Sequence, residues 1–307
     1  MDERERAGLL ETLASTPARL KASLAGVPKK LLLWTPAPGK WSIQEIVCHL
    51  RDMEREAYLA RYQRIMAEDN PSLPDVDGDR CALERDYRSL KLGEVLRDWA
   101  RLRKECLKLL KKVKGDEWQR IGTHETGGPL SMEAFLRRHA IGNDEAHLGQ
   151  IEAIKRRFET LAKLEAAPGA MTDATHGLSD DDWRRRPSPD KWSIVEIACH
   201  LRDLERLFVE RFAKMAWQER PALWMTDNER VAEALRYREA DPAAAAREWK
   251  RLRGDTLTLL RALPHATWQC TGLHPKRGEI TIEQLVSVLV GHDQGHIERI
   301  RSIRPAA

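Results

Sequence analysis

The chain has 307 residues, with 52 Lys and Arg against 48 Asp and Glu, and this composition predicts about two globular domains. The near balance of charge argues against a nucleic-acid-binding tail and against an acidic disordered protein. No apolar run approaches the roughly 18 residues that a membrane helix needs. Five cysteines without a CxxC pair, and an N-terminus of mixed charge, predict neither a disulfide framework nor a signal peptide. We therefore expect a cytoplasmic protein without nucleic-acid or membrane partners.

The sequence contains one internal repeat. Residues 40–55 recur as residues 191–206 with 13 of 16 positions identical, at an offset of 151. Further along the chain the offset falls to 150 and then to 149, which we interpret as loop insertions in duplicated domains. No Gly/Ser-rich linker separates the copies. We expect one domain at residues 1–157 and a second at residues 158–307.

Each copy is predicted to be an all-α four-helix bundle, because apolar residues recur at helical spacing and strand-like alternation is scarce. The first helix of each copy is expected to begin around Pro17 or Pro168, since proline suits a first helical turn. The second helix begins at the S-x-x-E capping boxes of Ser42 and Ser193. The remaining helices are expected at residues 93–113 and 243–263 and, in the second copy, from Thr281 onward.

Three histidines of the second copy are expected to share one site inside the bundle. His292 and His296 are spaced i, i+4, so both lie on one face of a helix about one turn apart. His200 lies on the apolar face of another helix, and facing helices build metal sites in bundle interiors. Three imidazoles leave a divalent ion with an open position, which is typical of a catalytic or ligand-binding site. Asp203 and Asp293 are candidates to orient the imidazoles.

The corresponding site of the first copy is incomplete. His49 and His147 are present, but Asn143 occupies the position of His292. A carboxamide oxygen is a poor ligand for zinc or nickel, so this is a degenerate metal site. His139 could replace Asn143 only if the site moved by about 6 Å. A histidine on an apolar helix face is also commonly a hydrogen-bonded core residue, and this alternative applies to both copies.

The combined motifs resemble the DinB-like family of four-helix metalloproteins. They are K-W-S-I-x-E-I-x-C-H-L within residues 38–50 and 189–201, H-P-x-x-G-x-I-T-I at 274–282, and G-H-D-x-x-H-I at 291–297. The resemblance covers essentially the whole chain as two tandem domains. It implies that the family's metal-binding triad corresponds to His200, His292 and His296. Because the family usually forms dimers of single domains, the two copies are expected to pack as an internal pseudo-dimer within a monomer, or the chain forms a homodimer.

The resemblance also implies a function. We expect an enzyme in which a divalent ion (zinc, nickel or iron) acts as a Lewis acid on a small molecule. Thiol-dependent transfer with a low-molecular-weight thiol, or hydrolysis, is the chemistry that the family suggests. The alternative is a non-catalytic metal-binding or interaction protein whose histidines only stabilise the bundle. An open coordination position that faces a pocket would distinguish the enzyme from this alternative.

Overall fold

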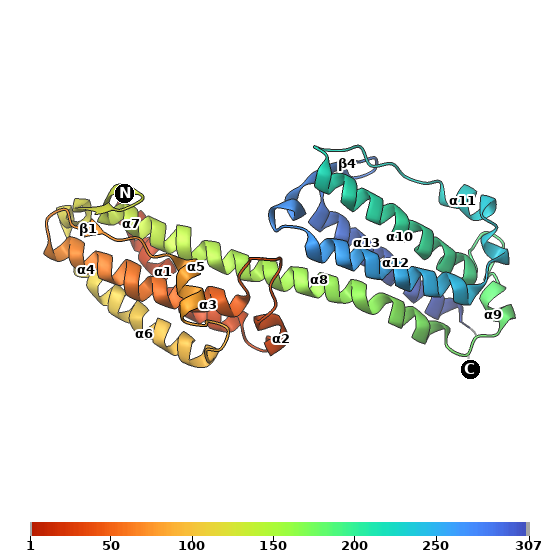
Figure 1. The fold of residues 1–307 in the computed structure, drawn as a ribbon, viewed down its shortest axis with the longest axis horizontal. Coiled ribbons are helices and arrows are strands. Elements are labelled where there is room, and N and C mark those ends of the chain that lie inside the picture. The colour runs from red at the N-terminus through yellow and green to blue at the C-terminus, as the bar shows by residue number, and fades with distance from the viewer. Residues whose placement is uncertain (1, 305–307) are drawn as a thin grey trace. The chain divides into compact units, whose positions relative to one another are not determined.

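The computed structural model describes residues 2–304, which form two compact helical units (Figure 1). The boundary between the units falls between Lys155 and Arg156, inside helix α8 (Ala146–Thr175), and residues 36–38 are assigned to the second unit. Each unit is built on four long helical segments joined by short helices and a small β-hairpin. The prediction of two tandem all-α four-helix bundles is therefore confirmed.

The first unit forms its four long segments from helices that are in part continuous with one another. These segments are α1 (Glu3–Ser23); α3 (Ile43–Asp52) with the π-helical η1 (Met53–Leu59) and α4 (Ala60–Ala67); α6 (Leu92–Leu110); and α7 (Met132–Arg137) with the π-helical η3 (Arg138–Glu145) and the start of α8. The short elements are α2 (Lys29–Leu32), α5 (Gly78–Glu84), η2 (Gly115–Gln119), β1 (Ser72–Leu73), β2 (Ile121–His124) and β3 (Gly128–Ser131). Strand β2 pairs with β1 in parallel and with β3 in antiparallel orientation.

The second unit repeats this plan with uninterrupted helices. Its long helices are the second part of α8, α10 (Ile194–Trp217), α12 (Pro242–Ala262) and α13 (Ile282–Ile303). The short elements are α9 (Asp180–Arg184), α11 (Asn228–Ala234), η4 (Tyr237–Glu239), η5 (Ala266–Gln269), β4 (Thr271–His274) and β5 (Gly278–Thr281). The antiparallel β4–β5 hairpin has the same register as β2–β3 and leads directly into α13.

The predicted helix starts are confirmed where a capping box marks them. Helix α3 begins after Ser42, α10 after Ser193 and α13 after Thr281, each with the reciprocal hydrogen bonds of a capping box. The Ser193 hydroxyl and backbone N–H both donate to Glu196, at 2.6 and 2.9 Å. These caps fix where the helix that carries His200 starts.

The predicted position of the two prolines was wrong. Pro17 and Pro168 lie in the middle of α1 and α8, not in their first turns. Proline has no N–H, so Pro17 leaves the carbonyl of Leu13, four residues earlier, without its helical partner. The guanidinium of Arg103 donates a hydrogen bond to that carbonyl at 2.9 Å. A side chain from another helix therefore replaces the missing backbone bond.

The second unit repeats this arrangement with a buried arginine of α12. Arg253 donates to the carbonyl of Leu164, which Pro168 leaves free, at 2.9 Å. The same guanidinium donates to Glu205 of α10 at 2.8 Å and lies 2.7 Å from the Asp293 carboxylate of α13. One side chain thus contacts all three other helices of its bundle.

The offset between the two copies changes inside helices, whereas we expected it to change in loops. The offset changes from 151 at Glu54 to 150 at Arg61, and η1 lies between these residues. It changes from 150 at Ser131 to 149 at Asp144, where η3 lies. A π-bulge accommodates one extra residue in a helix without breaking it. The first copy therefore carries two single-residue insertions as π-helical turns.

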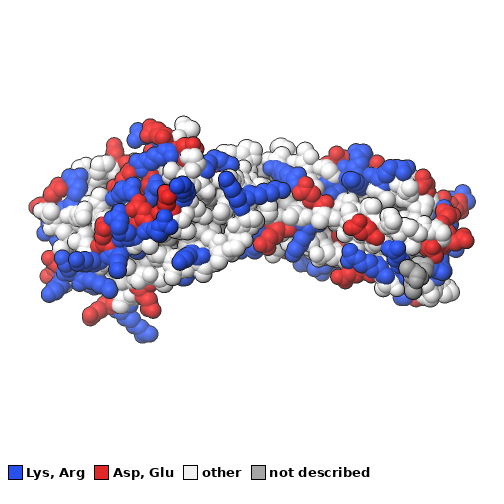
Figure 2. Space-filling view, turned by 90° about the horizontal axis from the view of Figure 1, so that it is seen from below, with Lys and Arg blue, Asp and Glu red and all other residues white. Residues whose placement is uncertain are grey.

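Within residues 2–304, no helix is both long and apolar enough to cross a membrane. On the face drawn in Figure 2, Lys and Arg side chains are interspersed with Asp and Glu side chains. This mixed distribution agrees with the small net charge of +4.

Candidate metal centre

The second unit brings its three predicted histidines together. His200 projects from α10 toward His292 and His296, which lie one turn apart on α13. The Nε2 atoms of His200 and His292 are 3.0 Å apart, and one ring nitrogen from each of the three residues lies within 4.8 Å of the others. The three ring centroids are 4.4 to 5.1 Å apart. Three imidazoles from two helices therefore converge on one point.

The surroundings of His200 and His296 keep these two rings in the form that binds metal. Burial, reinforced by the neighbouring His292, lowers the pKa of His200 and of His296 to about 3. Both rings are therefore neutral near pH 7 and keep a nitrogen lone pair available. The Nδ1 atoms of His292 and His296 are buried without a hydrogen-bond partner. The Nε2 atom of His292 faces His200, so an ion between the rings would bind that nitrogen and leave the Nδ1 of His292 to other partners.

Asp203 lies near His200 but is bound to other residues. It accepts hydrogen bonds from the Tyr237 hydroxyl at 2.8 Å and from Arg202 at 2.7 Å. The ring of Trp192 packs edge-on against His200, with centroids 4.9 Å apart. Asp203 therefore fixes the segment that carries Tyr237 beside the site. Its predicted role in orienting an imidazole stays a prediction.

Asp293 connects the site to the buried arginine network. Its Oδ2 atom lies 2.7 Å from Arg253, and its Oδ1 atom lies 3.7 Å from the Nδ1 of His292. The second distance is longer than a hydrogen bond. Asp293 therefore holds the start of the His292–His296 turn against α12, and its predicted contact with the imidazole stays a prediction.

A cavity of about 380 Å³ opens beside His292. Helix α10 provides an apolar wall of Leu204, Leu207 and Phe208. A smaller pocket of about 30 Å³, lined by His200, adjoins the cavity and shares part of this wall. The histidine site therefore faces a space large enough for a small molecule.

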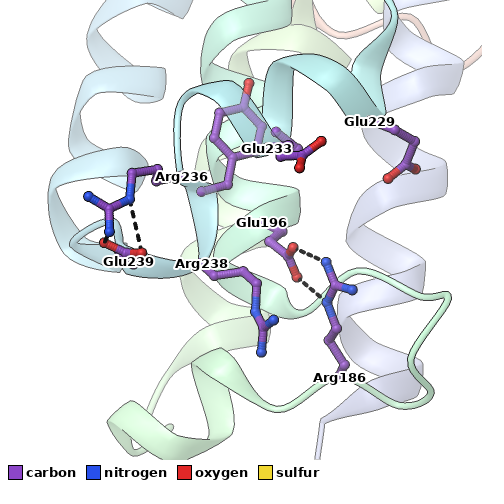
Figure 3. A pocket seen from close by; sticks show the side chains of 9 residues that line it. Arg186, Glu196, Glu229, Glu233, Arg236, Arg238 and Glu239 are labelled. Carbon is purple, nitrogen blue, oxygen red and sulfur yellow. Dashed lines mark hydrogen bonds and ion pairs between the residues drawn. The ribbon is translucent and has the colours of Figure 1, made fainter.

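The second unit has a larger pocket of about 490 Å³ around α11 and η4 (Figure 3). Four of its seven charged side chains form the ion pairs Arg186–Glu196 and Arg236–Glu239 (Figure 3). The residues that line it include none of the three histidines. We therefore place the candidate site at the cavity beside His292.

The first unit brings together His49 and His147, with ring centroids 5.0 Å apart, but the third position differs. The Asn143 amide donates to the neighbouring Asp144, and the His147 Nδ1 is paired with Gln150. The backbone at Gly78 closes over the His49 ring, because a Cβ atom there would lie 2.9 Å from that ring. The first unit therefore offers two imidazoles in a site that the chain itself fills.

His139 does not replace Asn143. Its Nε2 lies 3.0 Å from Glu54 in the buried network of Arg103, and the Cys106 thiol is close by. The Arg103 guanidinium donates to Glu54 at 2.6 Å and supplies the positive charge of this cluster. An arginine there makes a second cation unfavourable, so we do not assign this cluster as a metal site.

Sequence reasoning missed the residues that line the far end of the cavity, Arg211 and His274. It also missed the buried Arg253. Each residue has a counterpart in the first copy, so repetition of a polar residue at the same position of both copies was the available signal.

Comparison with known proteins identifies the family to which the chain belongs. A family model of the DinB superfamily matches the chain twice, at residues 12–151 and 163–300. A protein of Geobacillus thermodenitrificans (strain NG80-2) named "Putative metal-dependent hydrolase" is 25% identical over 149 residues, which are 48% of this chain and 83% of that protein. The solved structure "YfiT from Bacillus subtilis is a probable metal-dependent hydrolase with an unusual four-helix bundle topology" has 24% identity and a TM-score of 0.45, and the match covers 47% of this chain and 83% of that one. Because the family model matches both halves of the sequence, the chain belongs to the DinB superfamily.

Proposed function

We propose that the second unit is a metal-dependent enzyme that acts on a small molecule, with His200, His292 and His296 as the ligands of one divalent ion. The observation that carries the proposal is the convergence of three imidazoles from two helices on one point. The name of the Geobacillus relative supports metal-dependent hydrolysis as the type of reaction. Three protein ligands leave a coordination position open, and His292 lines the adjoining cavity.

The chain's own residues prepare this site in three ways. Burial holds the imidazoles of His200 and His296 neutral. The Arg253–Asp293 ion pair fixes the turn that carries His292 and His296, and the apolar wall of α10 limits water around a bound molecule. A divalent zinc, nickel or iron ion would supply Lewis acidity for polarising a carbonyl group or lowering the pKa of water. Hydrolysis is the reaction we favour. Transfer to a low-molecular-weight thiol is the second candidate, because an open position can also bind a thiolate.

Metal analysis of untagged protein tests the ligand set. We expect one divalent ion per chain by inductively coupled plasma mass spectrometry, and none after His292→Ala, because two imidazoles hold an ion much more weakly than three. The matched control is His147→Ala in the first unit, which should leave one ion per chain. Circular dichroism should show unchanged helicity in both variants. Unchanged metal content in His292→Ala would contradict the site.

A cobalt(II)-loaded protein distinguishes the enzyme from a structural metal protein. An open coordination position binds added azide, which changes the visible absorption of the cobalt centre. The protein should also hydrolyse a small ester when loaded with metal and lose this activity in His292→Ala. A visible spectrum that azide does not alter, together with no hydrolysis, would instead support the non-catalytic alternative.

A further inference from the structure

The cavity beside His292 has an excess of positive charge at its far end. Arg211 and His274 lie there in buried positions, and Lys276 and Arg277 form an exposed rim. Among the described residues that line the cavity, none is aspartate or glutamate. Burial lowers the pKa of His274, and the charges that add to this effect are the cations Arg211, Arg277 and Lys276. This end of the cavity therefore lacks a counter-charge of its own.

The first unit provides an internal comparison, because it repeats the same scaffold. Arg61 corresponds to Arg211, and each donates from its Nη2 atom to a backbone carbonyl of the segment that follows its helix, Pro74 or Trp224. His124 and His274 occupy the same register position of their hairpins. The paired arginine and histidine are thus placed alike in both units.

The two units differ in what faces this pair. In the first unit the carboxylate of Asp75 lies 3.8 Å from Arg61 and 3.6 Å from His124, and it also accepts a hydrogen bond from Thr126 at 2.9 Å. Burial alone would raise the pKa of Asp75, but the hydrogen bond from Thr126, together with His124 and Arg61, lowers it. In the second unit Met225 occupies the position of Asp75. The arginine–histidine pair of the second unit has therefore lost its built-in carboxylate.

In the second unit the Arg211 guanidinium donates a hydrogen bond to the Trp224 carbonyl and faces no carboxylate among the residues that line the cavity. The residue is only 5% exposed, and its Nε atom, like that of Arg61 in the first unit, is buried without a hydrogen-bond partner. Burial lowers the pKa of Arg211, and the neighbouring Glu210 offsets this only in part, so an anion in the cavity would stabilise the charged guanidinium. Met225 lines the cavity and is 40% exposed, so an apolar side chain stands where the first unit has a carboxylate. The Asp75 carboxylate of the first unit shows which chemical group this scaffold accepts.

We propose that the cavity of the second unit binds a small molecule that carries a carboxylate. The carboxylate is held by Arg211 and His274, with Lys276 and Arg277 at the rim, and the rest of the molecule lies along the apolar wall of α10 toward His292. This assignment rests on the proposed function only in naming the bound molecule as the substrate. The carboxylate site itself is formed without the histidine ligands.

The first test restores the missing carboxylate. Met225→Asp should place an anion against Arg211 and His274 as Asp75 does in the first unit, and Met225→Asn is the neutral control of the same shape. Isothermal titration calorimetry compares phenylacetate with the uncharged phenylacetamide. The unsubstituted protein and Met225→Asn should prefer phenylacetate by about ten-fold or more, because charge-assisted hydrogen bonds are the stronger ones. Met225→Asp should lose this preference while its metal content is unchanged.

Two results would overturn the inference. One is equal binding of phenylacetate and phenylacetamide, or no measurable binding of phenylacetate at millimolar concentrations. The other is an equal loss of the preference for phenylacetate in Met225→Asn and Met225→Asp, because such a loss would come from the shape of the new side chain and not from its charge. A double variant of the exposed rim, Lys276→Gln with Arg277→Gln, should weaken phenylacetate binding without affecting folding. Lys250→Gln, on an exposed face of α12, is its control.

The same titrations in His296→Ala separate this inference from the proposed function. If phenylacetate binds the histidine variant normally and Met225→Asp still abolishes binding, the carboxylate site stands whether or not the chain holds a metal ion. If binding disappears in His296→Ala and is unaffected by Met225→Asp, the carboxylate binds the metal directly. That outcome would overturn the inference and leave the metal site supported.

Discussion

Arg253 is a single residue whose loss should affect the whole second bundle. Arg253→Met would leave two buried carboxylates, Glu205 and Asp293, without their cation and the Leu164 carbonyl without a donor. Removing one partner of a buried ion pair costs about 3–5 kcal/mol. We expect a decrease of that size in the free energy of unfolding, measured by urea denaturation. Arg251→Met, which removes an exposed arginine paired with Glu248, should change it by less than about 0.5 kcal/mol.

Asn143 is the residue that separates the incomplete site from the complete one. Asn143→His would restore a third imidazole near His49 and His147, and we expect the metal content to rise from one toward two ions per chain. Asn143→Gln, which keeps the amide, is the control and should leave one ion. A content of one ion in both variants would mean that the backbone at Gly78 closes the first site regardless of its ligands.

At the scale of elements, the start of α10 depends on its capping box. Ser193 is fully buried and donates twice to Glu196, so Ser193→Ala should lower the free energy of unfolding by about 1 kcal/mol. Ser179 forms a similar box at the exposed start of the short helix α9, and Ser179→Ala should cost less. Chemical denaturation of the two variants checks this order. An equal decrease in the free energy of unfolding in the two variants would indicate that burial adds nothing to the stabilisation by the capping box.

The elements also show which features the sequence could predict. Capping boxes and apolar spacing are local, so the starts of α3, α10 and α13 and the convergence of His292 with His296 followed from spacing. The position of Pro168 inside α8 depends on Arg253, a tertiary contact that local rules do not contain. A one-residue insertion looks the same in a sequence whether it lies in a loop or in a π-bulge, so η1 and η3 were not predicted.

The cationic end of the cavity could not be predicted for a similar reason. Arg211 lies on α10, His274 on β4 and Met225 in the connection between α10 and α11, and only the folded chain brings them together. The β-hairpins themselves are short and lack a clear alternating pattern. Repetition of the arginine and the histidine in both copies indicated importance but not a common location.

At the scale of the whole molecule, buried histidines in both units should make stability depend on pH. Burial lowers the pKa values of His49, His200 and His296 to about 3, whereas an unfolded histidine titrates near 6.5. Between these values the unfolded chain binds protons that the folded chain does not, so stability falls as the pH is lowered from about 6.5 to 3. Denaturant midpoints of metal-free protein across this range measure the effect.

The stability of the protein should fall a second time at lower pH. Burial raises the pKa of Glu54, but His139 and Arg103 outweigh it and lower the pKa to about 2, against 4.5 in the unfolded chain. The stabilisation from Glu54 is therefore complete above about pH 4.5 and is lost as the pH approaches 2. His49→Gln should reduce the loss of stability between pH 6.5 and 3 and leave the loss that comes from Glu54 unchanged. A midpoint that stays constant from pH 6.5 to 4.5 would contradict the role of the histidines.

The contact between a mid-helix proline and a distant guanidinium has a consequence for how such domains diverge. A residue other than proline at position 168 would donate its N–H to the Leu164 carbonyl, as in a regular helix. The hydrogen bond from Arg253 to that carbonyl would then no longer be needed. If Arg253 were replaced first, Pro168 would leave the Leu164 carbonyl without a hydrogen-bond donor. We therefore expect these two positions to be inherited as a pair, and substitutions at one to accompany substitutions at the other among descendants of the same ancestral domain.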